Sequence, residues 1–179
     1  MIPNCWSTDR LLISTFGNRE IESMRYVFEA NLYLKDLDPT FTEYADETFR
    51  SLIQRDGSAT EKVASGTFYL RKISNQQGNI VGYIQIELNT PEEGRVWIPM
   101  MVFHPDYQNC GCGKEVFASV EAHISELGTY SEIALNVYAK NLAAFEFWYR
   151  RGFSEIVWWS NQTHHEQRYQ CLVLRKMLG

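Results

Sequence analysis

Residues 96–128 read VWIPMMVFHPDYQNCGCGKEVFASVEAHISELG, and the expected fold is built outward from this stretch. Residues 96–103 are almost uninterrupted Val, Trp, Ile, Met and Phe, which is typical of a strand covered on both faces. Pro105 ends the strand, and residues 114–127 then carry apolar side chains at helical spacing until Gly128. The stretch therefore predicts a buried strand, a glycine-containing loop and an amphipathic helix, in that order.

The loop in the middle of this stretch has the chemistry of an anion site. Gly111 and Gly113 let the backbone approach a ligand closely, because neither residue carries a Cβ. Backbone N–H groups at the start of the following helix lie at the positive end of its dipole, where they attract negative charge. The sequence therefore predicts an anion site here, and phosphate is the expected anion.

Two common phosphate-binding motifs do not fit the loop. A nucleotide-triphosphate loop has the form G-x-x-x-x-G-K-[ST]. If its second Gly and its Lys are Gly113 and Lys114, the motif needs Gly at 108 and Ser or Thr at 115. The chain has Gln108 and Glu115 at those positions. The dinucleotide fingerprint G-x-G-x-x-G starting at Gly111 needs Gly at 116, which is Val116. Both motifs are excluded.

Length and composition favour one ordinary globular domain spanning residues 1–179. The net charge of −5 argues against a general nucleic-acid-binding protein. No apolar run approaches the roughly 18 residues needed to span a bilayer, so no membrane association is expected. The first residues, MIPNCWSTDR, lack the basic and apolar regions of a secretory signal, and a cytoplasmic protein is expected.

The cysteines give little sign of a metal or a disulfide. Cys110 and Cys112 are too close in sequence to form an easy disulfide, and both fall inside the predicted anion loop. A C-x-C pair without a second Cys or His pair nearby is weak support for zinc. We therefore expect reduced thiols and no metal.

Acidic residues are concentrated in residues 19–61, which contain ten acidic and five basic side chains. One interpretation is a solvated helical surface. The other is an acidic rim that attracts a cationic amine. The sequence leaves both open.

The remaining periodicities predict a mixed α/β domain in the order β-α-α-β-β-β-α-β-α-β-β. The expected elements are a strand at 10–16, a helix from about 19, a second helix from a capping box at Thr40 and Glu43, a hairpin at 67–73 and 80–88, the strand at 96–103, the helix from 114, a strand at 132–138, a helix at 141–151, and strands at 153–159 and 168–176 joined by a polar loop at 160–167.

Two segments of the chain resemble motifs of one family. Residues 108–113 (QNCGCG) resemble the [Q/R]-x-x-G-x-[G/A] pyrophosphate loop of the GNAT superfamily of N-acetyltransferases, and residues 104–107 (HPDY) resemble its usual lead-in. Residues 141–153 (NLAAFEFWYRRGF) are similar to the family pattern N-x-x-A-x-x-[L/F]-Y-x-x-x-G-F. The predicted element order also matches the GNAT acyl-CoA N-acyltransferase fold, so the resemblance covers essentially the whole chain.

The resemblance implies that acetyl-coenzyme A (acetyl-CoA) is the co-substrate. In the family, a splayed fourth strand offers backbone groups to the pantetheine arm, the loop holds the diphosphate, and an Asn contacts the arm. The CoA-binding residues implied here are Met101, Val102, Phe103, Gln108, Asn109, Cys110, Gly111, Cys112, Gly113, Lys114, Asn141 and Trp148. A solvated side chain is the alternative for Lys114, and a helix N-cap is the alternative for Asn141.

The catalytic residues are less well defined. The family Tyr that commonly protonates the CoA sulfur aligns with Trp148, whose indole N–H is not a useful acid. Tyr149 is the candidate acid, although it lies about 100° further round the helix. Glu87 in the hairpin is the candidate general base, with a solvent-facing strand residue as the alternative. The thiolate could instead leave unassisted, since the pKa of a thiol is about 8.5.

These observations predict an N-acetyltransferase that moves the acetyl group of acetyl-CoA to a primary amine in a ternary complex. A small cationic amine, an amino acid, and a protein N-terminus or lysine remain open as acceptors. The alternative is a non-catalytic acyl-CoA-binding or sensing domain that keeps the same fold. A homodimer is compatible with the resemblance, and the length of the acyl chain is open.

Overall fold

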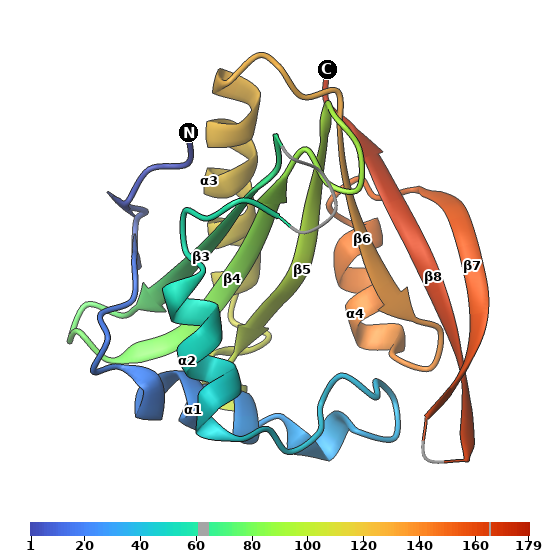
Figure 1. The fold of residues 1–179 in the computed structure, drawn as a ribbon, viewed down its shortest axis with the longest axis horizontal. Helices are drawn as coiled ribbons and strands as arrows, with labels where there is room; N and C mark the ends of the chain where they lie inside the picture. The colour runs from blue at the N-terminus through green and yellow to red at the C-terminus, as the bar shows by residue number, and fades with distance from the viewer. Residues whose placement is uncertain (61–64, 165) are drawn as a thin grey trace.

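A single mixed sheet forms the centre of the molecule, with strand order β1-β2-β3-β4-β5-β6-β8-β7 (Figure 1). The computed structural model describes residues 1–60, 65–164 and 166–179. The strands are β1 (Cys5–Ser7), β2 (Leu12–Ser14), β3 (Thr67–Ser74), β4 (Ile80–Leu88), β5 (Arg95–Phe103), β6 (Glu132–Tyr138), β7 (Glu155–His164) and β8 (Gln167–Met177). The helices are α1 (Ile21–Glu29), α2 (Asp46–Gln54), α3 (Cys112–Glu126) and α4 (Leu142–Tyr149), with 3-10 turns η1 (Leu32–Leu34) and η2 (Pro105–Tyr107).

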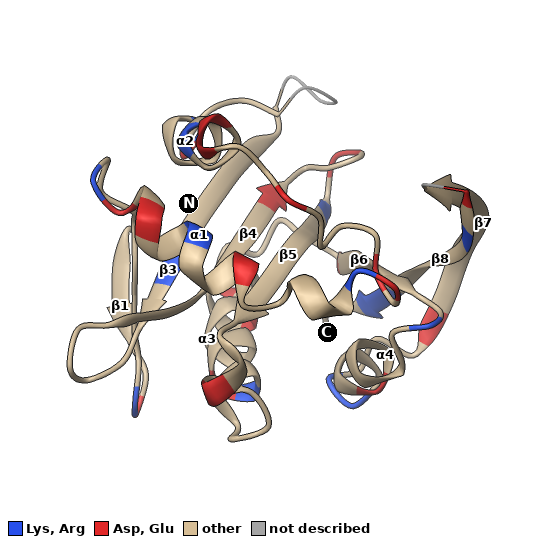
Figure 2. Cartoon of the chain, turned by 90° about the horizontal axis from the view of Figure 1, so that it is seen from below, with Lys and Arg blue, Asp and Glu red and all other residues tan. Residues whose placement is uncertain are grey.

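The helices cover both faces of the sheet. Strands β1 to β5 follow one another as antiparallel neighbours, and α3 is the crossover that brings β6 back parallel to β5. Helices α1 and α2 lie over one face, and α3 lies over the other (Figure 2). Strand β8 then inserts between β6 and β7, with antiparallel pairing on both sides. The predicted mixed α/β fold is confirmed.

Each helical layer has its own apolar core. On the α3 side, Val116, Phe117 and Val120 are buried against the sheet, as the helical spacing of apolar residues predicts. On the α1 and α2 side, Phe28 and Phe49 are buried, with ring centroids 5.7 Å apart. Burial of these faces, more than intrinsic helix propensity, stabilises helices this short.

A buried ion pair fixes the end of α2 to β3. Arg71 is 1% exposed, and its Nη1 donates to both carboxylate oxygens of Asp56, at 2.8 and 2.9 Å. Its Nε donates to the carbonyl of Pro3 at 2.8 Å, and Asp56 also accepts the N–H of Leu70 at 3.0 Å. This network joins the N-terminal segment, α2 and the sheet through charged groups that are largely removed from water.

The predicted start of the second helix is wrong. Helix α2 begins at Asp46 with Ala45 at the N-cap, and not at the predicted capping box of Thr40 and Glu43. The backbone N–H of Thr40 instead donates to the Asp38 carboxylate at 2.9 Å. An Asx turn of this kind, next to Pro39, competes with helix formation and delays the helix.

The strand predictions also need two corrections at the edges of the sheet. The strand predicted at 10–16 is shorter, Leu12–Ser14, and the unpredicted strand β1 pairs with it. Most of the polar stretch 160–167 is strand and not loop, because β7 runs to His164 and β8 begins at Gln167. This part of the hairpin is mostly exposed, so its sequence lacks the apolar alternation of a half-buried strand. His165, which belongs to the same stretch, lies outside the described residues.

Candidate functional site

The sheet opens between β5 and β6. These two strands pair only at Arg95–Glu132, Val96–Ile133 and Trp97–Ala134. Strand β5 also carries one additional residue relative to β4, because Gln85 pairs with Met100 whereas Glu87 pairs with Trp97. Pro99 lies at this bulge, where its missing N–H removes no ladder hydrogen bond. From Ile98 onward, the side of β5 that faces β6 has no paired strand within the described part of the chain.

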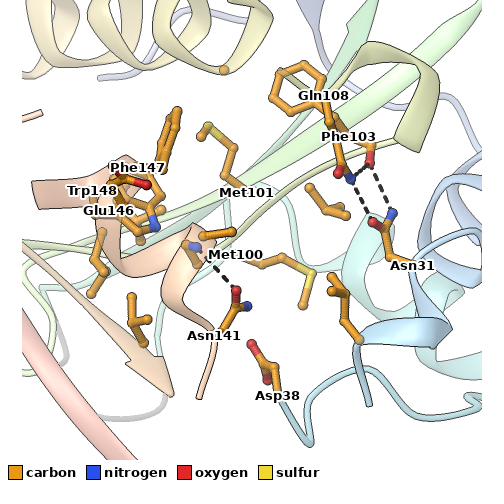
Figure 3. A pocket seen from close by; sticks show the side chains of 18 of the residues that line it. Asn31, Asp38, Met100, Met101, Phe103, Gln108, Asn141, Glu146, Phe147 and Trp148 are labelled. Carbon is orange, nitrogen blue, oxygen red and sulfur yellow. Dashed lines mark hydrogen bonds between the residues drawn. The ribbon is translucent and has the colours of Figure 1, made fainter. Parts of the chain in front are cut away.

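A cavity of about 570 Å³ fills the opening (Figure 3). Its walls come from the second half of β5, from β6, from α4 and from the chain between α1 and α2, and one end reaches the loop before α3. The residues that line it include Asp38, Thr40, Phe41, Met100, Met101, Val102, Phe103, Gln108, Asn109, Gly111, Gly113, Lys114, Asn136, Asn141, Glu146, Phe147, Trp148, Arg150 and Arg151.

The loop ends in an uncapped helix start. Gly111 is the N-cap of α3 with φ 88°, a backbone conformation that favours Gly. Asn109 also has a positive φ, of 56°. Because the N-cap is a Gly, it has no side chain to accept an N–H group of the first turn of α3, and N–H groups at a helix start are the standard setting for a bound anion.

Arg10 and Thr8 hold this loop from the β1–β2 connection. Arg10 donates from Nη1 to the carbonyl of Cys110 at 3.0 Å and from Nε to Glu115 at 2.7 Å. The Thr8 hydroxyl donates to the same carboxylate at 2.5 Å. Burial acts to raise the pKa of Glu115, but the hydrogen bonds from Thr8 and Arg10 outweigh it and hold the pKa below its ordinary value. The loop therefore has a fixed support.

Gln108 holds the loop from the opposite side. Its Nε2 donates to Asn31 Oδ1 at 2.8 Å and to the Phe103 carbonyl at 2.9 Å. Asn31, which is fully buried, donates to the same Phe103 carbonyl at 3.0 Å (Figure 3). The first residue of the motif thus ties the loop to the end of β5 and to the chain that follows α1.

The two cysteines of the loop lie together as free thiols, with their sulfur atoms 3.3 Å apart. A hydrogen bond from the Cys112 backbone lowers the pKa of the exposed Cys110 thiol. Burial raises the pKa of Cys112 to about 11. Neither residue lines the cavity. Both residues therefore contribute to the shape of the loop and not to the lining of the cavity.

Among the described residues, ten of the twelve predicted CoA-binding residues line the cavity, the two cysteines being the exceptions. Asn141 lines it and also caps α4, because its Oδ1 accepts the N–H of Ala144 at 3.2 Å. Trp148 is 8% exposed and packs edge-on against Phe117, with centroids 5.1 Å apart. The helix-cap interpretation of Asn141 is confirmed, whereas its contact with a ligand remains a prediction.

The two predicted catalytic residues lie elsewhere. Tyr149 is 55% exposed and stacks on Phe145, outside the lining of the cavity. Glu87 is half-buried on β4, pairs across the sheet with Trp97, and is also absent from that lining. The structure therefore does not bring either side chain to the cavity.

Sequence analysis missed Asp38. It lines the cavity from the chain between η1 and α2, opposite α4 (Figure 3). The acidic segment 19–61 contained it, but the sequence did not distinguish it from its neighbours. Figure 2 shows acidic residues on α1, on α2 and in the chain around these helices. Glu61 lies outside the described residues.

None of the helices among the described residues has the length and apolar character that a membrane-spanning helix needs. No three His, Cys, Asp or Glu side chains in the described residues are grouped as ligands for a metal ion.

The comparisons agree with this geometry. Residues 29–153 match the model of the acetyltransferase (GNAT) family. An acetyltransferase of the GNAT family from Bacillus anthracis has 16% sequence identity and a TM-score of 0.74, over 97% of this chain and 98% of that one. An acetyltransferase from Thermus thermophilus has 17% identity and a TM-score of 0.66, over 97% and 100% of the two chains.

PaiA N-acetyltransferase from Thermoplasma acidophilum, solved in complex with coenzyme A, has 14% identity and a TM-score of 0.64, over 94% of this chain and 99% of that one. At such identities the likeness shows the fold. A search of curated proteins found no match. The family model, by contrast, covers well over half of the chain, including both strands of the opening, the loop and α4. The chain therefore belongs to the GNAT family of acetyltransferases.

Proposed function

We propose that this acetyltransferase transfers the acetyl group of acetyl-CoA to the nitrogen of a primary amine, with both substrates bound at once. The observation that carries the proposal is the continuity of one cavity. It runs from the uncapped start of α3, past the unpaired side of β5, to the chain between α1 and α2. The end at the start of α3 would bind the anionic diphosphate. The end at the chain between α1 and α2 would receive the acceptor amine.

The loop fits the diphosphate of acetyl-CoA. Uncapped N–H groups at a helix start bind phosphate oxygens, and Lys114 lines the same end of the cavity with a positive charge. Gly113 leaves little room for a larger residue, since a Cβ there would lie 3.1 Å from the Phe147 ring, which would have to shift. The residues present are therefore compatible with a phosphate group close to the backbone.

The unpaired side of β5 supplies the backbone groups. Met100, Met101 and Val102 line the cavity, and the backbone groups of this segment that point away from β4 face no paired strand within the described residues. Backbone N–H groups aimed at a carbonyl oxygen stabilise the negative charge that develops there during acyl transfer. Such donors are already fixed in position by β4, so little reorganisation is needed at the moment of reaction.

Protonation of the leaving sulfur does not need Tyr149 in this proposal. A thiol has a pKa of about 8.5, so a thiolate leaves without assistance near neutral pH. We expect Tyr149→Phe to reduce turnover by less than about tenfold, because an exposed side chain outside the cavity makes no contact with the reacting atoms. Initial rates of thiol release measure the effect. A loss of about a hundredfold would instead identify Tyr149 as a general acid.

Two measurements test the function. Acetyl-CoA at about 100 times its Kd should stabilise the protein by ~2.7 kcal/mol. For a domain of this size that corresponds to a rise in Tm of roughly 5–10 °C. A panel of primary amines, scored by release of free CoA thiol, should then give turnover with at least one amine.

The rival is an acyl-CoA-binding domain without catalysis, and Trp148 in the family Tyr position is the observation that favours it. Binding without turnover on any small amine or peptide amine would support that rival. Absence of any thermal shift with acetyl-CoA would contradict both assignments.

A further inference from the structure

We propose that Asp38 selects the acceptor by binding a second ammonium group, so that the preferred acceptor is a diamine-like molecule and not a simple monoamine. This inference rests on the proposed function. It goes further, because it names the part of the cavity that recognises the acceptor and the charge that this part requires.

Asp38 differs from the other acidic residues of segment 19–61. Several of those are paired: Glu20 with Lys72, Asp46 with Arg25, and Asp56 with Arg71. Among the described residues, no Lys, Arg or His forms a salt bridge with Asp38, although it lines the cavity. Asp38 therefore presents an uncompensated carboxylate to the cavity.

The carboxylate of Asp38 is held in place. Its Oδ1 accepts the backbone N–H of Thr40 at 2.9 Å, which fixes the turn around Pro39. Phe41 and Met100, both apolar, line the same cavity. Burial raises the pKa of Asp38, and the hydrogen bonds from Thr40 offset only part of that effect. A bound ammonium would supply the charge that the protein itself does not provide.

Charge is divided between the two ends of the cavity. Lys114 lines it from the start of α3, and Glu146, Arg150 and Arg151 line it from α4 and the residues just after this helix. Asp38 lines it from the chain between η1 and α2. Arg150 is paired with Glu146, but Lys114 and Arg151 form no salt bridge among the described residues. An anionic co-substrate is thus attracted to one end and a cationic acceptor to the other.

The second ammonium, and not the reacting nitrogen, is the group that suits Asp38. An amine must lose its proton before it attacks a carbonyl, and a carboxylate beside it stabilises the protonated form. A separate ammonium has no such requirement. Binding it at Asp38 would hold the molecule while its other nitrogen stays free to react.

The experiment compares two acceptors of nearly equal shape, putrescine and n-pentylamine, which differ by an ammonium in place of a methyl group. Wild-type protein should prefer putrescine in kcat/KM. In Asp38→Asn, which keeps the oxygen that accepts from Thr40, this preference should fall by about tenfold or more while the KM for acetyl-CoA stays the same. Asp36→Asn is the matched control, since it removes the same charge from an exposed neighbour and should leave the preference unchanged.

A second readout does not depend on turnover. Asp38→Asn should raise the Tm of the free protein, because it removes an uncompensated half-buried carboxylate, and Asp36→Asn should not. Putrescine added with CoA should raise the Tm of the wild type but not of Asp38→Asn. Asp38→Glu, which keeps the charge, should retain part of the preference.

The failures of the two proposals differ. If the wild-type protein releases no thiol with any of the amines tested, the proposed function is contradicted. Wild-type protein that turns over but does not prefer putrescine, or a preference that survives in Asp38→Asn, overturns the role of Asp38 alone. A folded Asp38→Asn that loses turnover equally with both amines also overturns it, because the side chain would then act in the reaction and not in selection.

Discussion

Gly113→Asp is expected to weaken the binding of CoA by roughly a hundredfold or more. The added Cβ would lie 3.1 Å and 3.2 Å from two carbon atoms of the Phe147 ring, so the wall of the cavity must move to accept it. The carboxylate would also lie beside the N–H groups that we assign to the diphosphate. Like charges brought together in a binding site cost several kcal/mol, which corresponds to a loss of affinity of roughly a hundredfold or more. Titration calorimetry with CoA measures the change.

Two further variants separate charge from bulk. Gly113→Ala adds the Cβ alone, and Ala is favourable inside a helix, so a smaller loss of affinity is expected from it. Gly78→Asp introduces the same residue in the turn between β3 and β4, where a Cβ meets open space. The φ of Gly78 is 82°, so this variant should lose some stability, but it should leave CoA binding unchanged. Wild-type affinity in Gly113→Asp would show that the co-substrate is not held at this loop.

Asp56→Ala is expected to cause the largest loss of stability. It leaves the guanidinium of Arg71, which is 1% exposed, without its carboxylate, and it removes the acceptor of the Leu70 N–H. Breaking a buried ion pair by removing one partner costs about 3–5 kcal/mol. For a domain of this size the Tm should fall by roughly 10 °C or more, which a thermal melt followed by circular dichroism measures.

Asp56→Asn serves as the control for this prediction. The amide keeps the shape of the side chain and an oxygen for Leu70 and Arg71, but it loses the charge, so an intermediate loss is expected. A Tm for Asp56→Ala within about 2 °C of wild type would mean that water replaces the carboxylate at little cost. The buried pair would then be unimportant for the fold.

Local sequence patterns were enough to predict most of the elements. The apolar run at 96–103, the spacing from Val116 to Ile124 and the alternation along β4 each report the burial of one element against the sheet. The start of α2 was mispredicted because the Thr40 and Glu43 pattern is short, and an Asx turn at Asp38 uses the same residues. The β7–β8 hairpin extends further than expected because its exposed end needs no apolar side chains.

The cavity could not be derived in the same way. The strands that form its walls were predicted, but their separation after three paired residues is a property of the sheet as a whole. Pro99 was the available local signal, since Pro within a central strand indicates a bulge or an unpaired side. Asp38 lies in the cavity only because β5 and α4 surround it, and neither is near it in sequence. The resemblance identified the loop, and the acceptor side required the three-dimensional arrangement.

The gap between β5 and β6 also bears on how this protein can change over generations. Met100 and Asn136 face the cavity from its two walls, yet each is secured on its outer side by a paired strand, β4 or β8. A substitution at either position reshapes the cavity without disturbing the pairing of β5 with β6. In the described structure that pairing ends at Trp97 and Ala134, before either position is reached. The acceptor preference can therefore change while the fold stays the same. Descendants of one ancestral chain can diverge in substrate while they keep the same sheet.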